Sequence, residues 1–171
     1  MFEVHPRDQA RHFTVGEPMC GSNGCVYLTE YSHVVKFTPN AEEADLAEEI
    51  YFEKPRGFPR VEEVGVADFS FTEYDQSVYY IVREAAADLT DVEKYHLDGL
   101  WIEQAFEYPK KRLEVNCESL NAALAWLRRV SWAISDVGFA NLGITDSGEI
   151  VVRDFGEAWR EGPTALCGAS S

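Results

Sequence analysis

The spacing of apolar and polar residues divides the chain into a part rich in short strands and a part rich in helices. Residues 13–37 predict three short strands, with the glycine-containing turn CGSNG after the first. Asn40 then precedes AEEADLAEEIYFE, and Glu43 stands three residues on, which predicts a helix that begins with a capping box and stops near Pro55. The runs VEEVGVADFSF and VYYIVREA predict two further strands.

The second half of the chain has mainly helical spacing. The segments DVEKYHLDGLWIEQAF and SLNAALAWLRRVSWAI carry apolar residues at the intervals of a helix, the second more clearly than the first. The run ANLGITDSGEIVVRDFG predicts a hairpin whose turn is Asp146-Ser147-Gly148. Residues after Leu166 form a short Gly/Ala/Ser tail that we expect to be disordered. The order of elements predicts the α+β class.

Composition and charge narrow the functional classes. A chain of 171 residues with 46% hydrophobic content can bury one core, or two small lobes that share a cleft. Its formal charge of −15 disfavours direct binding of nucleic acid and of anionic membranes, and suits either a basic protein partner or a simply solvated surface. No segment approaches the length of a membrane span, so we expect a cytoplasmic protein.

The cysteines and histidines do not predict a zinc site. The four cysteines form no C-x-x-C pair, and the four histidines are scattered along the chain. We therefore expect reduced thiols.

Two carboxylates and an amide follow the better of the two helices. Asp136 and Asn141 lie five residues apart in SDVGFAN, and Asp154 ends the hairpin that follows. Hard oxygen ligands of this kind suit Mg²⁺, which leaves its other positions to water and phosphate oxygens. The alternative is that Asp136 and Asn141 only make turn hydrogen bonds, as such residues often do in loops.

The first half supplies a glycine turn and a strand lysine. Gly21-Ser22-Asn23-Gly24 would let backbone N–H groups approach a polyphosphate, although such a turn is also ordinary in a hairpin. Lys36 lies among apolar residues and, if buried, needs a carboxylate, which Glu48 or Glu49 could supply. The alternative is a surface lysine that reaches into solvent.

These features occur in the order that protein kinases share: glycine turn, strand lysine, helix glutamate, D-x-x-x-x-N and D-F-G. Over roughly residues 13–160 the chain resembles a minimal member of the protein-kinase-like superfamily, similar to small kinases of bacteriophages and of injected bacterial effectors. The resemblance implies a bilobal fold with a five-stranded antiparallel N-lobe plus one helix (residues 1–85), a truncated helical C-lobe (residues 86–162) and a tail (residues 163–171).

The resemblance also implies roles for individual residues. Lys36 would contact the nucleotide phosphates and pair with Glu49, with Glu48 as the alternative one position away. Asp136 would accept the proton of the attacking hydroxyl, and Asn141 and Asp154 would bind Mg²⁺. The residues that would contact ATP are Gly21, Ser22, Asn23, Gly24, Val26, Lys36 and the backbone near Glu84 and Ala85.

Three departures from the family pattern accompany this set. Ile134 and Ser135 replace the usual His-Arg before Asp136, Gly138 replaces a basic residue, and too few residues follow Gly156 for an activation segment. The resemblance still implies an ATP- and Mg²⁺-dependent kinase that acts on Ser or Thr of a protein, including host proteins. One alternative is a kinase-shaped acidic protein that inhibits a basic host protein by contact, and a less favoured one is a small-molecule phosphotransferase.

Overall fold

The structure is a computed structural model that describes residues 14–29, 32–67 and 77–162. It belongs to the α+β class, as predicted, and combines a five-stranded antiparallel sheet with four α-helices and two small two-stranded sheets in the described residues. Its strands are β1 (Thr14–Gly21), β2 (Gly24–Thr29), β3 (His33–Thr38), β4 (Val61–Val66), β5 (Tyr79–Glu84), β6 (Trp132–Ile134), β7 (Leu142–Ile144), β8 (Ile150–Val152) and β9 (Ala158–Arg160). Its helices are α1 (Ala41–Glu53), α2 (Asp91–His96), α3 (Gly99–Glu107) and α4 (Glu118–Val130), with 3-10 turns at Pro109–Lys111 and Phe139–Asn141.

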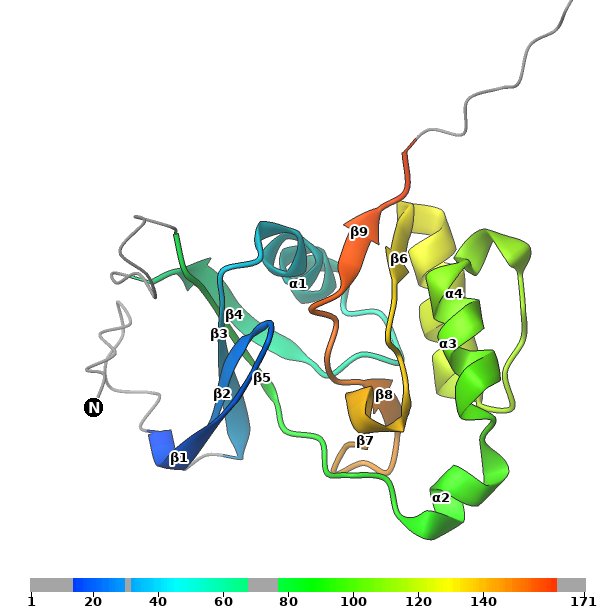
Figure 1. Cartoon of the computed structure of the whole chain (residues 1–171), viewed down its shortest axis with the longest axis horizontal. Coiled ribbons are helices and arrows are strands. Elements are labelled where there is room, and N and C mark those ends of the chain that lie inside the picture. The colour runs from blue at the N-terminus through cyan, green and yellow to red at the C-terminus, as the bar shows by residue number, and fades with distance from the viewer. Residues whose placement is uncertain (1–13, 30–31, 68–76, 163–171) are drawn as a thin grey trace, which may run out of the picture.

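The five strands of the first half form one sheet in the order β1-β2-β3-β5-β4, with α1 beside it. Figure 1 shows this sheet on one side of the molecule, α3 and α4 on the other, and the small sheets between them. The five predicted strands and the single helix of the first half are thus confirmed. The predicted strand residues 13, 30–31 and 68–71, and the predicted tail after Leu166, lie outside the described ranges.

The helix α1 has the bounds that the sequence predicts, and Asn40 caps it. The side-chain oxygen of Asn40 accepts hydrogen bonds from the backbone N–H groups of Glu42 and Glu43. The second half of the predicted capping box is wrong, because Thr38 Oγ1, and not Glu43, accepts the bond from the Asn40 amide at 3.1 Å. The side chain of Glu43 is therefore free to turn toward the sheet.

Two of the helical predictions need correction. The first predicted helix is broken at Leu97 and Asp98, because Asp98 caps a new helix by accepting from the Trp101 amide at 3.1 Å. The second predicted helix ends at Ser131, whose φ of 60° is left-handed, and the residues that follow pair as β6 with β9. Helical spacing alone did not show that WAI continues as a strand.

One apolar core runs from α1 and β4 to α3 and α4. Phe155 is buried in this core, and its ring lies edge-on to Phe58 at 6.2 Å. The predicted hairpin forms as β7 and β8 around the expected turn, where Gly148 has a φ of +83°. The core and the hairpin together fix the position of Asp154, which precedes Phe155. No described helix is both long and apolar enough to span a bilayer.

Candidate functional site

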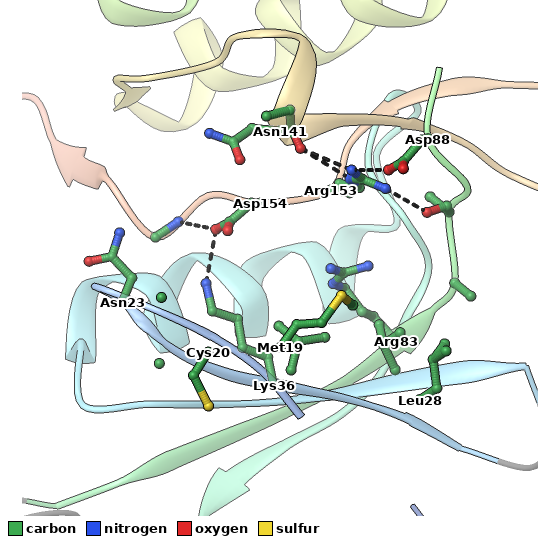
Figure 2. A pocket seen from close by; sticks show the side chains of 18 of the residues that line it. Met19, Cys20, Asn23, Leu28, Lys36, Arg83, Asp88, Asn141, Arg153 and Asp154 are labelled. Atoms are coloured by element: carbon green, nitrogen blue, oxygen red, sulfur yellow. Dashed lines mark hydrogen bonds and ion pairs between the residues drawn. The ribbon is translucent and has the colours of Figure 1, made fainter. Parts of the chain in front are cut away.

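A cleft of about 1070 Å³ lies between the five-stranded sheet and the small hairpins. Gly21, Ser22, Asn23, Gly24, Val26, Lys36, Ala85, Asp136, Asn141 and Asp154 all line it. Figure 2 shows how several of these side chains point into the same space from different elements. Of the predicted site residues, only Glu49 and Glu84 do not line the cleft.

Lys36 connects the sheet, α1 and the Asp-Phe-Gly corner. Its Nζ donates to Glu43 Oε1 at 2.6 Å and to Asp154 Oδ1 at 2.9 Å. Lys36 and Glu43 are almost fully buried, so each needs the other's charge to offset the loss of hydration. Burial raises the pKa of Glu43, even though Lys36 opposes that shift. The lysine is thus buried and paired, and the surface alternative is wrong.

The predicted partner, Glu49, is incorrect. Residues Glu43, Leu46, Ala47 and Ile50 form the buried face of α1, whereas Glu48 is exposed and Glu49 pairs with Arg160 at the surface. Positions three, four and seven residues apart share one face of a helix, so Glu43 and not Glu49 faces the sheet. The apolar pattern of the helix, which places Leu46, Ala47 and Ile50 on the same face as Glu43, was a signal for this pairing.

Asp154 is held in place by bonds from both sides. Besides Lys36, the amide of Gly156 donates to its Oδ1 at 3.0 Å. Burial alone would raise the pKa of Asp154, but the charge and hydrogen bond of Lys36, with the Gly156 amide and Arg83, hold it below its ordinary value. The carboxylate is therefore kept ionised inside the cleft. Asn40 supports the same corner, since its Nδ2 donates to the Gly156 carbonyl at 2.7 Å.

Asp136 and Asn141 form the opposite wall of the cleft. The Nδ2 of Asn141 donates to the backbone oxygen of Asp136 at 2.5 Å, which fixes the amide and leaves its oxygen without a hydrogen bond to another described residue. Asp136 has a left-handed φ of 58°, an uncommon conformation for a residue other than glycine. Its side chain is exposed, so its carboxylate is accessible from solvent.

The glycine turn closes over the Asp-Phe-Gly corner. Gly24 has a φ of +122°, and a Cβ there would lie 1.9 Å from the Phe37 carbonyl oxygen, so only glycine fits. Asn23 Nδ2 donates to Glu157 Oε1 at 2.9 Å. A Cβ on Gly156 would come within 2.9 Å of the Asn23 side chain. The tip of the turn thus packs directly on the chain that follows Asp154.

The expectation of reduced thiols is wrong for one pair of cysteines. Cys20 and Cys25 face each other across β1 and β2, with their Cα atoms 4.0 Å apart, and form a disulfide. Opposite residues of a hairpin come this close, so a spacing of five around a two-residue turn was a signal for the pair. Cys117 is a free thiol.

The backbone after β5 offers fewer groups to a ligand than expected. The amide of Glu84 donates to Arg60 O at 2.9 Å, and the amide of Ala85 donates to Ser32 O at 3.3 Å. The Glu84 carbonyl accepts from Arg83 Nη1 at 3.2 Å. Of the backbone groups expected to meet a base near Glu84 and Ala85, the two amides are therefore not available in this structure, because Arg60 and Ser32 already accept from them.

Arg153 is a site residue that the sequence analysis missed. Its guanidinium donates to Ala86 O at 3.1 Å and to Ala140 O at 3.0 Å, and it pairs with Asp88. Figure 2 shows it between the segment after β5 and the loop that carries Asn141. It fixes the two walls of the cleft relative to each other. Arg153 directly precedes the D-F-G motif, and nothing in the charge pattern around it indicated this role.

The polar groups of the cleft fit a magnesium ion that is completed by substrate. Among the described ranges, no cluster of at least three His, Cys, Asp or Glu residues could hold a metal alone. Asp154 offers its second carboxylate oxygen and Asn141 its amide oxygen, and Mg²⁺ takes its remaining ligands from water and phosphates. These two residues therefore fit an ion that arrives with a nucleotide, and they do not fit a permanently bound transition metal.

Comparisons with known proteins do not assign a family. No protein-family model matches the chain, and no curated protein matches it significantly. Among solved structures, it is similar to one described as a 2.2 Å crystal structure of WbdD, at 14% identity and a TM-score of 0.48. The match covers 86% of this chain and 33% of the other, so this chain spans about a third of that structure. A similarity at this level supports no argument about function.

Proposed function

We propose that the protein is a minimal protein kinase with a bilobal, kinase-like fold, and that it transfers the γ-phosphoryl group of a magnesium nucleoside triphosphate to a Ser or Thr hydroxyl. The observation that carries the proposal is the pairing of one buried lysine with Glu43 and Asp154, opposite Asp136 and Asn141 in the same cleft. Phosphoryl transfer depends mainly on positioning and charge, so this set of groups is the chemistry it requires.

Each of these residues has one part in the reaction. Lys36 holds a phosphate oxygen and is kept in place by Glu43. Asp154 and Asn141 hold Mg²⁺, which would neutralise the charge on the phosphates. Asp136 accepts the proton of the attacking hydroxyl, and its exposed carboxylate at the mouth of the cleft suits a large substrate.

The bonds around the cleft favour a kinase that needs no activation step. Asn40 and Asn23 already hold α1 and the glycine turn against the Asp-Phe-Gly corner, and Arg153 holds the segment after β5 against the loop that carries Asn141. In this arrangement no phosphorylated segment is needed to order the site. We infer that the enzyme is constitutively competent.

Transfer of a labelled γ-phosphate tests the proposal. The protein is incubated with Mg²⁺ and γ-labelled ATP or GTP, alone and with a cell lysate that supplies protein substrates. The amount of labelled protein is then measured. Asp136→Asn should lower labelling by about 10²-fold or more. Asp91→Asn, which changes an exposed aspartate of α2 outside the cleft, is the matched control and should leave labelling unchanged. Labelling that survives Asp136→Asn would remove the proposed base.

Exposed apolar residues favour a second candidate, a protein that inhibits its target by contact. Val92, Tyr95 and Leu100, on α2 and α3, are 67%, 86% and 76% exposed, and they lie on an acidic chain. Such a surface suits a basic partner with an apolar centre. Under this alternative, folded Lys36→Ala and Asp154→Ala variants keep the full biological effect, whereas the kinase proposal requires its loss.

A further inference from the structure

Arg83 places a second buried cation on the sheet face that lines the cleft. In the register of the sheet, Val34 lies opposite Arg83 and Lys36 lies opposite Ile81. Residues two apart on a strand share a face, so Arg83 and Lys36 are diagonal neighbours on the same face. Arg83 is only 6% exposed, and it lines the cleft. Figure 2 shows its guanidinium turned into the cleft, toward the side of Arg153 and Asp154.

Three cations that line the cleft differ in their partners. Lys36 contacts two carboxylates, and Arg153 contacts Asp88 and two carbonyl groups. The hydrogen bond of Arg83 in the described part of the chain goes to the Glu84 carbonyl, and no carboxylate there contacts it. Burial lowers the pKa of Arg83 to about 10, against the attraction of Asp154 and Glu43. A guanidinium has several more N–H donors, and leaving them buried without acceptors is costly.

The surroundings of Arg83 suit a flat apolar ligand with an acceptor at its edge. Val34 and Leu28 lie in the same row of the sheet as Arg83, and Met19 lies on β1 in the next row, that of Lys36; all three line the cleft. Met19 and Leu28 are 66% and 48% exposed, so they leave apolar surface open in the cleft. The Glu84 carbonyl accepts one hydrogen bond from Arg83, at 3.2 Å. This end of the cleft therefore offers the remaining N–H donors of Arg83 beside open apolar surface.

We propose that Arg83 selects the base of the nucleotide, and that the cleft prefers a purine with a carbonyl oxygen at C6, as in guanine or hypoxanthine, over adenine. An arginine donates well to O6 and N7 of such a base, whereas the 6-amino group of adenine presents a donor to a donor. The inference rests on the proposed function, because it refines the nucleotide that the same site takes. It departs from the ATP that the sequence resemblance implies.

The comparison of ITP with ATP tests this contact, because hypoxanthine and adenine differ only in the group at C6 and in the proton on the adjacent N1. Binding of ITP, GTP and ATP with Mg²⁺ is measured by calorimetry on the full chain, for the wild type, Arg83→Met and Arg60→Met. The wild type should bind ITP and GTP about 10-fold or more tightly than ATP. Arg83→Met should lose the preference by weakening ITP and GTP while ATP stays equal or tightens. Arg60, an exposed arginine outside the cleft, is the matched control and should change nothing.

The outcomes separate this inference from the proposed function. If the wild type binds ATP as tightly as ITP, the base selection is wrong and the nucleotide site stands. If Arg83→Met weakens all three nucleotides equally, Arg83 binds phosphate and the base selection is again wrong. If the folded wild type binds none of them, both proposals fail. Should Arg83→Met not fold, the ITP and ATP affinities of the wild type still decide the question.

Discussion

The ammonium of Lys36 lies 2.6 Å from the carboxylate of Glu43, and through this pair helix α1 is joined to the floor of the cleft. Glu43 begins the buried face of α1, so any shift of the helix along its axis would separate the two groups. Because the same Nζ also reaches Asp154, the pair determines where the Asp-Phe-Gly corner can lie. The position of one glutamate thus links the packing of α1 to the chemistry of the site.

Glu43→Ala should destabilise the fold and disable the site, whereas Glu49→Ala should do neither. Removing one partner of a buried ion pair costs about 3 kcal/mol, at the lower end of the usual range here because Asp154 remains beside Lys36. The surface pair of Glu49 and Arg160 should contribute less than about 1 kcal/mol. Urea unfolding and nucleotide titration of both variants check this. Equal costs for the two changes would contradict the assignment of Glu43.

The two carboxylates that share Lys36 should respond to pH in opposite directions. The pKa of Glu43 is raised above 4.5, so the folded state holds its proton more tightly than the unfolded state does. The stability of the wild type relative to Glu43→Gln should then be greatest below that pH and fall as the pH rises through the raised pKa.

For Asp154 the sign is reversed. Its pKa is lowered below 3.8, so its contribution relative to Asp154→Asn should be present above that pH and be lost as the pH falls through the lowered pKa. Urea unfolding of the wild type and both variants from about pH 3 to pH 7 measures how the difference in unfolding free energy between the wild type and each variant changes with pH. If the two differences change with pH in the same direction, the opposite pKa shifts of Glu43 and Asp154 are wrong.

Local patterns predicted the sheet and the helix α1, because each of these elements is specified by its own residues. Alternation of apolar and polar residues predicted the strands, and the capping residue Asn40 predicted the start of α1. The predictions failed where a tertiary contact decided between local alternatives. Thr38 accepts the hydrogen bond from the Asn40 amide, so Glu43 is not needed to cap α1. The helix α4 ends at Ser131, and Trp132–Ile134 pair with β9 as a strand. Arg83 and Arg153 were missed because their roles depend on which distant segments they face.

Asn40 should have two separable roles. Its side-chain oxygen caps α1, and its Nδ2 donates to the Gly156 carbonyl at 2.7 Å. Asn40→Ala removes both and should cost about 1 kcal/mol of stability as well as nucleotide affinity. Asn40→Asp keeps a good cap but replaces the donor by a carboxylate, so it should weaken nucleotide binding severalfold with little loss of stability.

Thr90→Ala is the control for the role of Asn40 in the site. Thr90 caps α2, which does not carry a residue of the cleft, so its loss should lower stability alone. Unfolding free energies and nucleotide affinities of the three variants are compared. If Asn40→Asp binds nucleotide as the wild type does, the bond to Gly156 has no part in the site.

The disulfide between Cys20 and Cys25 should make nucleotide affinity sensitive to reductant. The bond joins the strands on either side of Ser22-Asn23, so it limits the conformations of the turn that packs on Gly156. A turn that is already held near its ligand-bound conformation loses less conformational entropy when the ligand binds. Reduction, or the double change Cys20→Ser with Cys25→Ser, should therefore weaken nucleotide binding, and Cys117→Ser, which changes a free thiol outside the turn, should not. Mass spectrometry of the tryptic peptide 12–36 shows whether the bond is present, since reduction adds hydrogen to both sulfur atoms. Affinity that is unchanged while this peptide shifts in mass would mean that the turn is held by Asn23 and Glu157 without the disulfide.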